Sequence, residues 1–199
     1  EKMCLFWHNH FAIQSTDVVD SRFLYKYCNL IREQALGNFH TLTERITVDP
    51  AMLHYLNGNS NFRQSDDGGQ TFRASNENYG RELLELFTIG KGDDGTEAFY
   101  TEDDVRAAAR VLTGWIHRGR LSNRFPVTVE FRSNRHDPTP KQFSSHFNNQ
   151  VITDNGANEY KDLIEMIFNQ LETARFICRK LYRWFVYYEI DEQVENQVI

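Results

Sequence analysis

Apolar residues recur at helical spacing through most of this sequence. The opening segment places four side chains on one stripe with the i, i+3, i+4, i+7 spacing of an amphipathic helix: Met3, Phe6, Trp7 and His10. A second helix is predicted from about residue 18 to residue 36, with Gly37 as its stop. Asp49 followed by Pro50 predicts the cap and first turn of a short third helix.

The same spacing predicts later helices at about residues 77–89, 101–113, 159–171 and 173–188. Gly90 ends the first of these helices, and Thr101 with Asp104 three residues later resembles a capping box. Residues 57–75 are rich in Gly, Asp and Asn and hold few apolar anchors. That composition predicts a flexible, exposed loop.

One segment has the period-2 alternation of a strand instead. Its apolar positions are Phe125, Val127, Val129 and Phe131. Such alternation is typical of a half-buried strand, and Pro126 favours an edge or a strand start. The fold class predicted is mainly α, a multi-helix orthogonal bundle with a small β-hairpin or strand insertion around residues 125–145.

Length and composition bound the class of protein. The 199 residues fit a single helical domain, 1–199, and 40% apolar with 14% aromatic content argues against disorder. The net charge of -6 disfavours a nucleic-acid partner, because binding to the phosphate backbone depends on Lys and Arg. No stretch approaches the roughly 20 apolar residues of a transmembrane helix.

Several familiar chemistries lack their motifs. The three cysteines, Cys4, Cys28 and Cys178, have no Cys-x-x-Cys spacing and cannot form a disulfide framework. No phosphate-binding loop, Gly-x-Ser-x-Gly elbow or His-Glu-x-x-His helix occurs. Nucleotide hydrolysis, serine-hydrolase and zincin mechanisms therefore have little support.

The helix at residues 77–89 concentrates polar groups on one face. Asn78, Glu82 and Glu85 follow i, i+4, i+7 spacing, so they can point together into a cleft where carboxylates bind a divalent metal or exchange protons. Arg81 lies four residues from both Glu77 and Glu85, which equally predicts a solvated face of weak ion pairs. Tyr79, Leu83, Leu86 and Phe87 are predicted to face the core.

Two histidines are further candidates. His10 lies on an apolar stripe, so it is predicted to be buried, as a hydrogen-bonded core histidine or as a ligand or proton shuttle. His136 and Asp137 come in a turn, where they can present an imidazole and a carboxylate at a cleft edge or simply shape the bend before Pro138. Arg110 lies on a helical stripe that favours a solvated or salt-bridged face.

Six segments in order resemble a bacterial domain-of-unknown-function family, numbered 1800: FWHNHF from Phe6, IREQALGNFHTL from Ile31, DPAMLHYLN from Asp49, NENYGRELLELFTIG from Asn76, YTEDDVRAAARVLTGW from Tyr100 and HDPTPKQF from His136. The resemblance implies a large, mainly helical protein of which this chain is a central section. Family members commonly bear export signals, which implies a periplasmic or surface location.

Two functions are compatible with these patterns. In the first, an exported, envelope-associated protein gathers His10, Asn78, Arg81, Glu82, Glu85, His136 and Asp137 around one polar cleft that binds a ligand or divalent metal. Metal-assisted hydrolysis would then use Glu82 or Glu85 as ligand or base and His136 as proton shuttle. In the second, the same groups form a structural ion-pair network in a non-catalytic envelope scaffold or interaction module, with another envelope protein as partner.

Overall fold

A computed structural model describes residues 1–65, 72–92, 98–190, 193 and 197. The longer helices are α1 (Lys2–His10), α3 (Ser21–Gln34), α4 (Phe39–Thr47), α7 (Glu102–Val111), α8 (Glu159–Phe168) and α9 (Leu171–Phe185). The shorter ones are α2 (Ser15–Val18), α5 (Pro50–Tyr55) and α6 (Asn78–Glu82). The mainly α prediction is confirmed, and the orthogonal arrangement of the helices stays a prediction.

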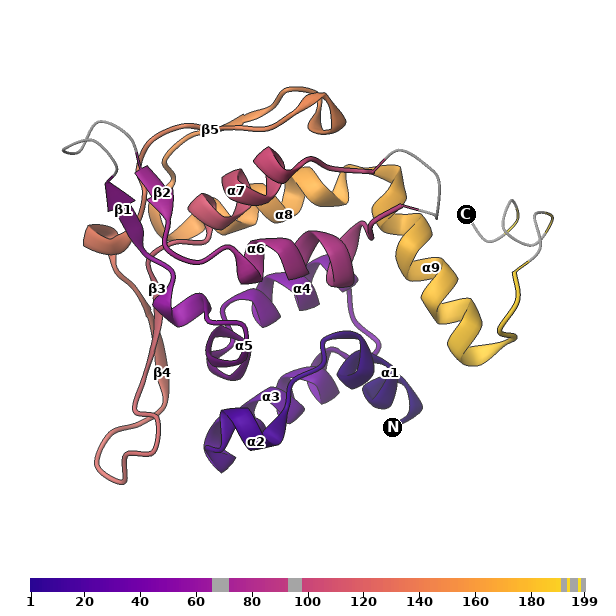
Figure 1. Ribbon diagram of the computed structural model, residues 1–199. Coiled ribbons are helices and arrows are strands. Elements are labelled where there is room, and N and C mark those ends of the chain that lie inside the picture. Colours follow the sequence, from indigo (N-terminus) through magenta and orange to yellow (C-terminus); the bar gives the residue numbers. More distant parts are fainter. Residues whose placement is uncertain (66–71, 93–97, 191–192, 194–196, 198–199) are drawn as a thin grey trace.

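Short antiparallel strand pairs accompany the helices. They are β1 (Arg63–Ser65) with β2 (Phe72–Ala74), β3 (Trp115–Arg118) with β4 (Thr128–Phe131), and β5 (Lys141–Gln142) with β6 (Val151–Ile152). In Figure 1, α1–α3 lie at one end of the molecule, α7 and α8 lie at the other, and α4–α6 lie between them. The pairs β1–β2 and β3–β4 lie on one side, and α9 lies on the opposite side.

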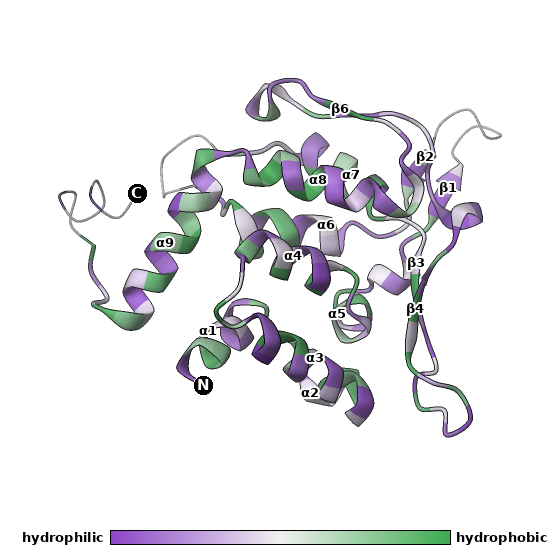
Figure 2. Ribbon diagram, turned by 180° about the vertical axis from the view of Figure 1, so that it is seen from behind, coloured by the Kyte–Doolittle hydropathy of each residue, from purple (hydrophilic) through white to green (hydrophobic). Residues whose placement is uncertain are grey.

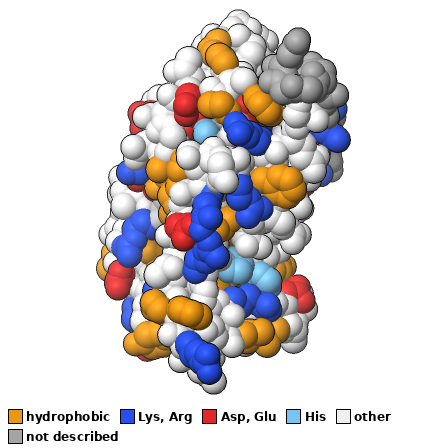
Figure 3. All heavy atoms as spheres, turned by 90° about the vertical axis from the view of Figure 1, so that its left-hand side faces the viewer, with side chains coloured by type: hydrophobic (Ala, Val, Ile, Leu, Met, Phe, Trp, Pro, Cys, Tyr) orange, Lys and Arg blue, Asp and Glu red, His pale blue; other side chains and the backbone are white. Residues whose placement is uncertain are grey.

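The core fills the spaces between the helices. Apolar and polar residues alternate around α3, α4 and α9 in Figure 2, as amphipathic helices require. Phe11, Phe23, Tyr27, Leu42 and Leu163 are fully buried. Several Lys and Arg side chains lie at the surface of the face that carries the strands (Figure 3). None of the described helices is both long enough and apolar enough to cross a membrane.

Several predicted helices differ from the observed ones. The helix predicted over residues 18–36 is divided, because Val19 has φ 60° and Asp20 begins α3 as a cap that accepts from the backbone N–H of Arg22. Helix α4 was not predicted; it begins where Asn38 accepts from the N–H of Thr41. The predicted cap at Asp49 is confirmed.

The predicted strand 125–131 needs correction, and part of the predicted flexible loop 57–75 is paired. Residues 63–65 and 72–74 of that loop pair as β1 and β2, residues 66–71 lie outside the described residues, and the flexibility of the loop stays a prediction. Strand β4 begins only at Thr128, and its partner β3 was not predicted. Phe125, predicted to face inward, is 67% exposed, because it precedes the paired strand.

Helix α6 continues into a π-helical turn, η2 (Leu83–Thr88). Tyr79, Leu83 and Phe87 are buried as predicted, but Leu86 is 48% exposed and Leu84 is buried in its place. A π-turn has more residues per turn than the 3.6 of an α-helix, so a 100° projection misplaces side chains beyond Leu83. The predicted inward position of Leu86 is therefore wrong.

The predicted capping box at the start of α7 is confirmed, and it does more than cap the helix. Asp104 accepts from the N–H of Thr101 at 2.7 Å, and the hydroxyl of Thr101 accepts from the N–H of Asp104. The same carboxylate accepts from the N–H and the hydroxyl of Ser144, both at 2.7 Å. Asp104 thus joins α7 to the segment after β5.

Candidate functional site

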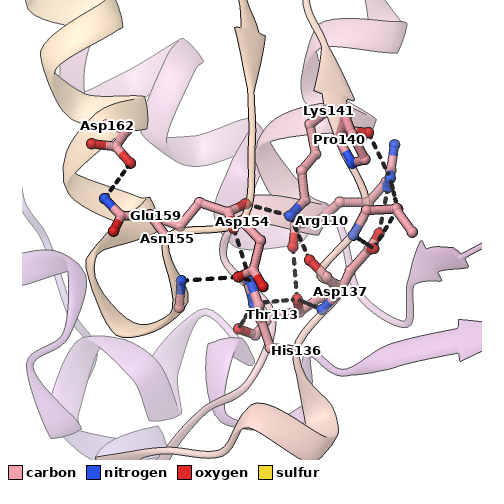
Figure 4. Close-up of polar contacts among 12 residues, drawn as sticks. Arg110, Thr113, His136, Asp137, Pro140, Lys141, Asp154, Asn155, Glu159 and Asp162 are labelled. Atoms are coloured by element: carbon pink, nitrogen blue, oxygen red, sulfur yellow. Dashed lines mark hydrogen bonds and ion pairs between the residues drawn. The ribbon is translucent and has the colours of Figure 1, made fainter.

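His136 and Asp137 lie together in the segment that follows the 3₁₀ turn η3 (Ser133–Arg135), between the end of α7 and the start of α8 (Figure 4). His136 is 3% exposed and Asp137 is fully buried. The turn position that suggested them is correct, but the turn is packed inside the protein. Each of their polar atoms must therefore find a partner.

Both ring nitrogens of His136 face hydrogen-bond acceptors. Its Nδ1 lies 3.0 Å from the backbone carbonyl oxygen of Thr113, which can only accept, so Nδ1 is placed to donate. Its Nε2 faces the other way, 2.9 Å from the carboxylate oxygen Oε2 of Glu159 and 3.8 Å from Oδ1 of Asp154. The hydroxyl of Thr113 accepts from the N–H of Asp137 at 2.9 Å and so fixes the turn.

A backbone constraint holds this neighbourhood in place. Gly114 has φ +94°, and a Cβ there would lie 2.9 Å from the carbonyl oxygen of Arg132 and 3.1 Å from Cβ of His136. Only glycine combines that conformation with such a close approach at low cost. The chain can therefore bring Thr113 directly against His136.

The carboxylate of Glu159 contacts His136 through one oxygen and Lys141 through the other. It is the first residue of α8, where the helix dipole favours a negative charge. Its second oxygen, Oε1, forms an ion pair with the ammonium of Lys141, and both side chains are fully buried. The same ammonium donates to the backbone carbonyl of Asp137. Lys141 is thereby held by β5 against both α8 and the turn.

Asp137 forms the second ion pair of the network. Its Oδ2 accepts from Nε of Arg110 at 2.6 Å, and its Oδ1 accepts from the hydroxyl of Thr139, also at 2.6 Å. Burial alone would raise the pKa of Asp137, but these hydrogen bonds outweigh it and hold that pKa below its ordinary value. The salt-bridged alternative predicted for Arg110 is the one observed.

Three potential metal ligands converge at the outer edge of this network. One ligand atom from each of His136, Asp154 and Glu159 lies within 4.8 Å of the others, the one such group of three among the residues that the structure describes. A histidine that donates its other N–H to a backbone carbonyl is typical of metal sites. Asp154 is half exposed, whereas His136 is 3% exposed and Glu159 is fully buried. The donor set of one imidazole and two carboxylates suits a divalent cation.

His10 lies in a different environment. Its ring is 4% exposed and packs against aromatic rings, including Phe11 and Trp7 with centroids 4.6 and 5.7 Å away. Its Nε2 lies 3.0 Å from the carbonyl oxygen of Phe87, whereas its buried Nδ1 has no hydrogen-bond partner. Burial, with the charge of Lys180 as a smaller cause, lowers the pKa of His10 to about 3. The core-histidine alternative therefore matches its surroundings best.

The predicted residues of α6 and η2 have partners of their own. Arg81 forms a two-pronged ion pair with Glu102, at 2.8 and 2.7 Å, and lies 3.9 Å from Glu77. Glu85 pairs with Lys91 at 2.6 Å, not with Arg81. The Asn78 amide lies 3.4 Å from the carbonyl oxygen of Leu56.

Burial, and then the charge of Glu85, raises the pKa of Glu82. Among the described contacts, none links this group or His10 to His136 or Asp137. The structure therefore does not bring the seven predicted residues around one cleft. The catalytic and ligand roles of Glu82 and Glu85 stay predictions.

No sequence pattern pointed to Glu159, Lys141, Asp154 or Thr113 as members of the site. Glu159 and Lys141 were visible only as a first-turn acid and as part of the segment HDPTPKQF. His136 and Glu159 are 23 residues apart and lie in a loop and a helix, so no periodic pattern connects them. A long-range contact of this kind becomes visible only in three dimensions.

The arrangement described above belongs to a mainly helical domain with a buried charge network at its turn-rich end. The whole chain, residues 1–199, matches the family described as "Protein of unknown function (DUF1800)", and the chain therefore belongs to that family. The predicted family resemblance is confirmed. No curated protein and no solved structure matches the chain.

Proposed function

We propose that this protein binds a divalent metal ion through His136, Asp154 and Glu159 and uses it in metal-assisted hydrolysis of a ligand. The observation that supports the proposal is the convergence of three ligand atoms within 4.8 Å around an imidazole whose Nδ1–H is anchored on the Thr113 carbonyl. We also propose, from the family resemblance, that the protein acts outside the cytoplasm.

The surrounding residues have definable tasks in this proposal. A bound ion would supply Lewis acidity and lower the pKa of a coordinated water. Thr113 orients the His136 ring so that Nε2 faces Glu159 and Asp154, which would hold an ion together with it, and Lys141 balances the charge of Glu159 on its inner oxygen. The Arg110–Asp137 pair keeps the turn rigid, which keeps the ligand atoms in register.

Asp154 provides the most selective test, since it is half exposed and its substitution disturbs the buried pairs least. The experiment is elemental analysis and equilibrium dialysis of untagged protein with Zn²⁺, Mn²⁺ and Mg²⁺, using Asp154→Asn. Asp103→Asn is the control, because that carboxylate is 84% exposed and pairs, among the described residues, with the nearby Arg106. We expect Asp154→Asn to lose one equivalent of metal and Asp103→Asn to keep it.

The double variant Glu82→Gln/Glu85→Gln separates this site from the one predicted on α6. If metal disappears in the double variant and persists in Asp154→Asn, the site belongs to α6 and the proposal is wrong.

The alternative is a structural role for the whole network in a non-catalytic envelope scaffold with a protein partner. One observation favours it: the Lys141 ammonium already neutralises Glu159, with both groups fully buried. Under this alternative no divalent ion binds at His136, and Glu159→Gln lowers the free energy of unfolding equally with and without added metal. Under the metal proposal, added metal stabilises the wild-type protein more than it stabilises Asp154→Asn.

A further inference from the structure

A second pair of histidines meets on the face that carries the strands. His54 comes from the last turn of α5 and His117 from β3, two elements that pack against each other. Nε2 of His117 lies 3.3 Å from Nδ1 of His54. Both side chains are partly exposed, and Figure 3 shows histidine side chains side by side on this face, next to Lys and Arg. None of the residues in the His136 network takes part.

The spacing of the two nitrogens equals the spacing of two ligands on one ion. Zinc–nitrogen bonds of about 2.0–2.1 Å at a tetrahedral angle place the two nitrogens about 3.3 Å apart. A neutral imidazole pair can also hold this distance with a single hydrogen bond, so the distance needs support from the orientation of the rings.

The rings are oriented by contacts outside the pair. The backbone carbonyl of Asp17 accepts a hydrogen bond from His54, and because Nδ1 faces His117, the nitrogen that donates is Nε2. Nδ1 of His54 therefore presents its lone pair to the gap between the rings. His117 packs edge-on against Phe23, with centroids 5.0 Å apart. In metal sites, the second ring N–H of a histidine ligand commonly donates to a backbone carbonyl, and apolar residues surround the ligands.

The local charges bear on the kind of ligand. Burial lowers the pKa of His117 to about 4, with the neighbouring His54 and Arg120 as smaller causes. Burial and Arg120 also lower the pKa of His54, while the charge of Asp17 acts in the opposite direction. Arg120 weakens cation binding and Asp17 strengthens it.

We propose that His54 and His117 form a two-histidine site for a borderline transition metal ion of the Zn²⁺ class, separate from the His136 group. Two protein ligands leave the remaining coordination positions to water or to a donor from a bound molecule. Imidazole donors select such ions over Mg²⁺ and Ca²⁺, which prefer oxygen ligands. The site joins α5 to β3, so occupancy adds a cross-link between a helix and the β3–β4 pair.

The test is a calorimetric titration with Zn²⁺ in the Asp154→Asn background, where the His136 group is disabled. We expect one zinc equivalent to bind, and His117→Phe, which keeps an aromatic ring against Phe23, to weaken that binding at least 10-fold. His8→Ala, which removes an exposed histidine of α1, is the matched control and should bind as its parent does. Mg²⁺ should produce no saturable heat.

Imidazole NMR signals provide a readout that does not depend on any variant. Zinc should shift the signals of His54 and His117 in the otherwise unmodified protein while that of His10, buried in the core, stays unchanged. Absence of saturable zinc binding in Asp154→Asn, or equal affinity in His117→Phe, would overturn the proposal. Failure of the His136 site alone would appear differently, as one zinc equivalent in wild type that survives Asp154→Asn.

Discussion

Two buried histidines with almost equal exposure, 4% for His10 and 3% for His136, occupy opposite kinds of environment. His10 is surrounded by aromatic rings and makes one hydrogen bond, to the Phe87 carbonyl. His136 uses both ring nitrogens, one on the Thr113 carbonyl and one on Glu159. Burial alone therefore does not distinguish a core histidine from a site histidine, whereas the groups opposite its nitrogens do.

The energetic consequences differ as well. Around His10, desolvation dominates and keeps the ring uncharged. Around His136, the ion pairs Lys141–Glu159 and Arg110–Asp137 surround the ring with compensated charge. Such a network is sensitive to the loss of any one member, because the remaining partner is left charged in a buried place. Changes at these two places should therefore differ in size and in pH dependence.

Removing the Lys141 ammonium should have the largest effect. Lys141→Met leaves Glu159 buried without its ion-pair partner, so we expect the free energy of unfolding to fall by about 3–5 kcal/mol. Urea denaturation in the presence of a chelator measures it. The double variant Lys141→Met/Glu159→Leu should recover much of the loss. A single-variant loss below about 1 kcal/mol would show that the pair is not buried as described.

The pH dependence of His10 should be the next largest effect. Its folded pKa, about 3, lies below the ordinary value of 6.5, so the unfolded chain takes up the proton first. The contribution of His10 to the free energy of unfolding is complete above pH 6.5 and is lost as the pH falls. Each pH unit below 6.5 should cost up to about 1.4 kcal/mol, or about 2 kcal/mol by pH 5.

The difference between wild type and His10→Phe isolates this contribution, because other groups titrate equally in both proteins. Urea unfolding at pH 7, 6 and 5 should give a steeper decline for wild type. Parallel declines would mean that the ring of His10 takes up its proton in the folded protein.

A smaller effect is expected at Thr113, which links the turn to α7. Thr113→Val keeps the shape of the side chain but leaves the N–H of Asp137 without its acceptor, a loss of about 1–3 kcal/mol. Thr43→Val is the matched control, since Thr43 is also fully buried but donates only within α4, to the Phe39 carbonyl. Thermal denaturation should place Thr113→Val below Thr43→Val; the reverse order would remove Thr113 from the network.

Asp154→Asn should change stability least. The carboxylate is half exposed and lies 3.8 Å from His136, so we expect a change within about 0.5 kcal/mol in metal-free buffer. Asp137→Asn, at a fully buried position paired with Arg110, should cost several times more. Equal losses in the two variants, measured by urea denaturation, would place Asp154 inside the structural network and weaken its role as a metal ligand.

Local features of the fold could be predicted from the sequence because local chemistry determines them. The capping box at Thr101 and the cap at Asp49 each depend on residues within three positions, and both are present. The π-turn η2 could not be predicted, because Leu83–Thr88 reads as ordinary α-helix when 100° per residue is assumed. That assumption led to the wrong prediction that Leu86 faces the core.

The candidate site was predictable only in part. His136 and Asp137 were identified from their turn, but their partners come from the end of α7, from β5 and from the start of α8. Glu159 alone has no distinguishing sequence feature, because first-turn acids are common in helices. Only the packing of α7 against α8 and of β5 against α7 brings the four segments together.

Asp104 has a consequence for the order in which parts of the protein open. Its carboxylate completes the start of α7 and also accepts two hydrogen bonds from Ser144, 40 residues later. If the β5–β6 segment detaches, the buried carboxylate in the first turn of α7 loses two of its hydrogen-bond donors. The amides of Thr101 and Ser144 should therefore exchange with deuterium at the same rate, as members of one cooperative unit.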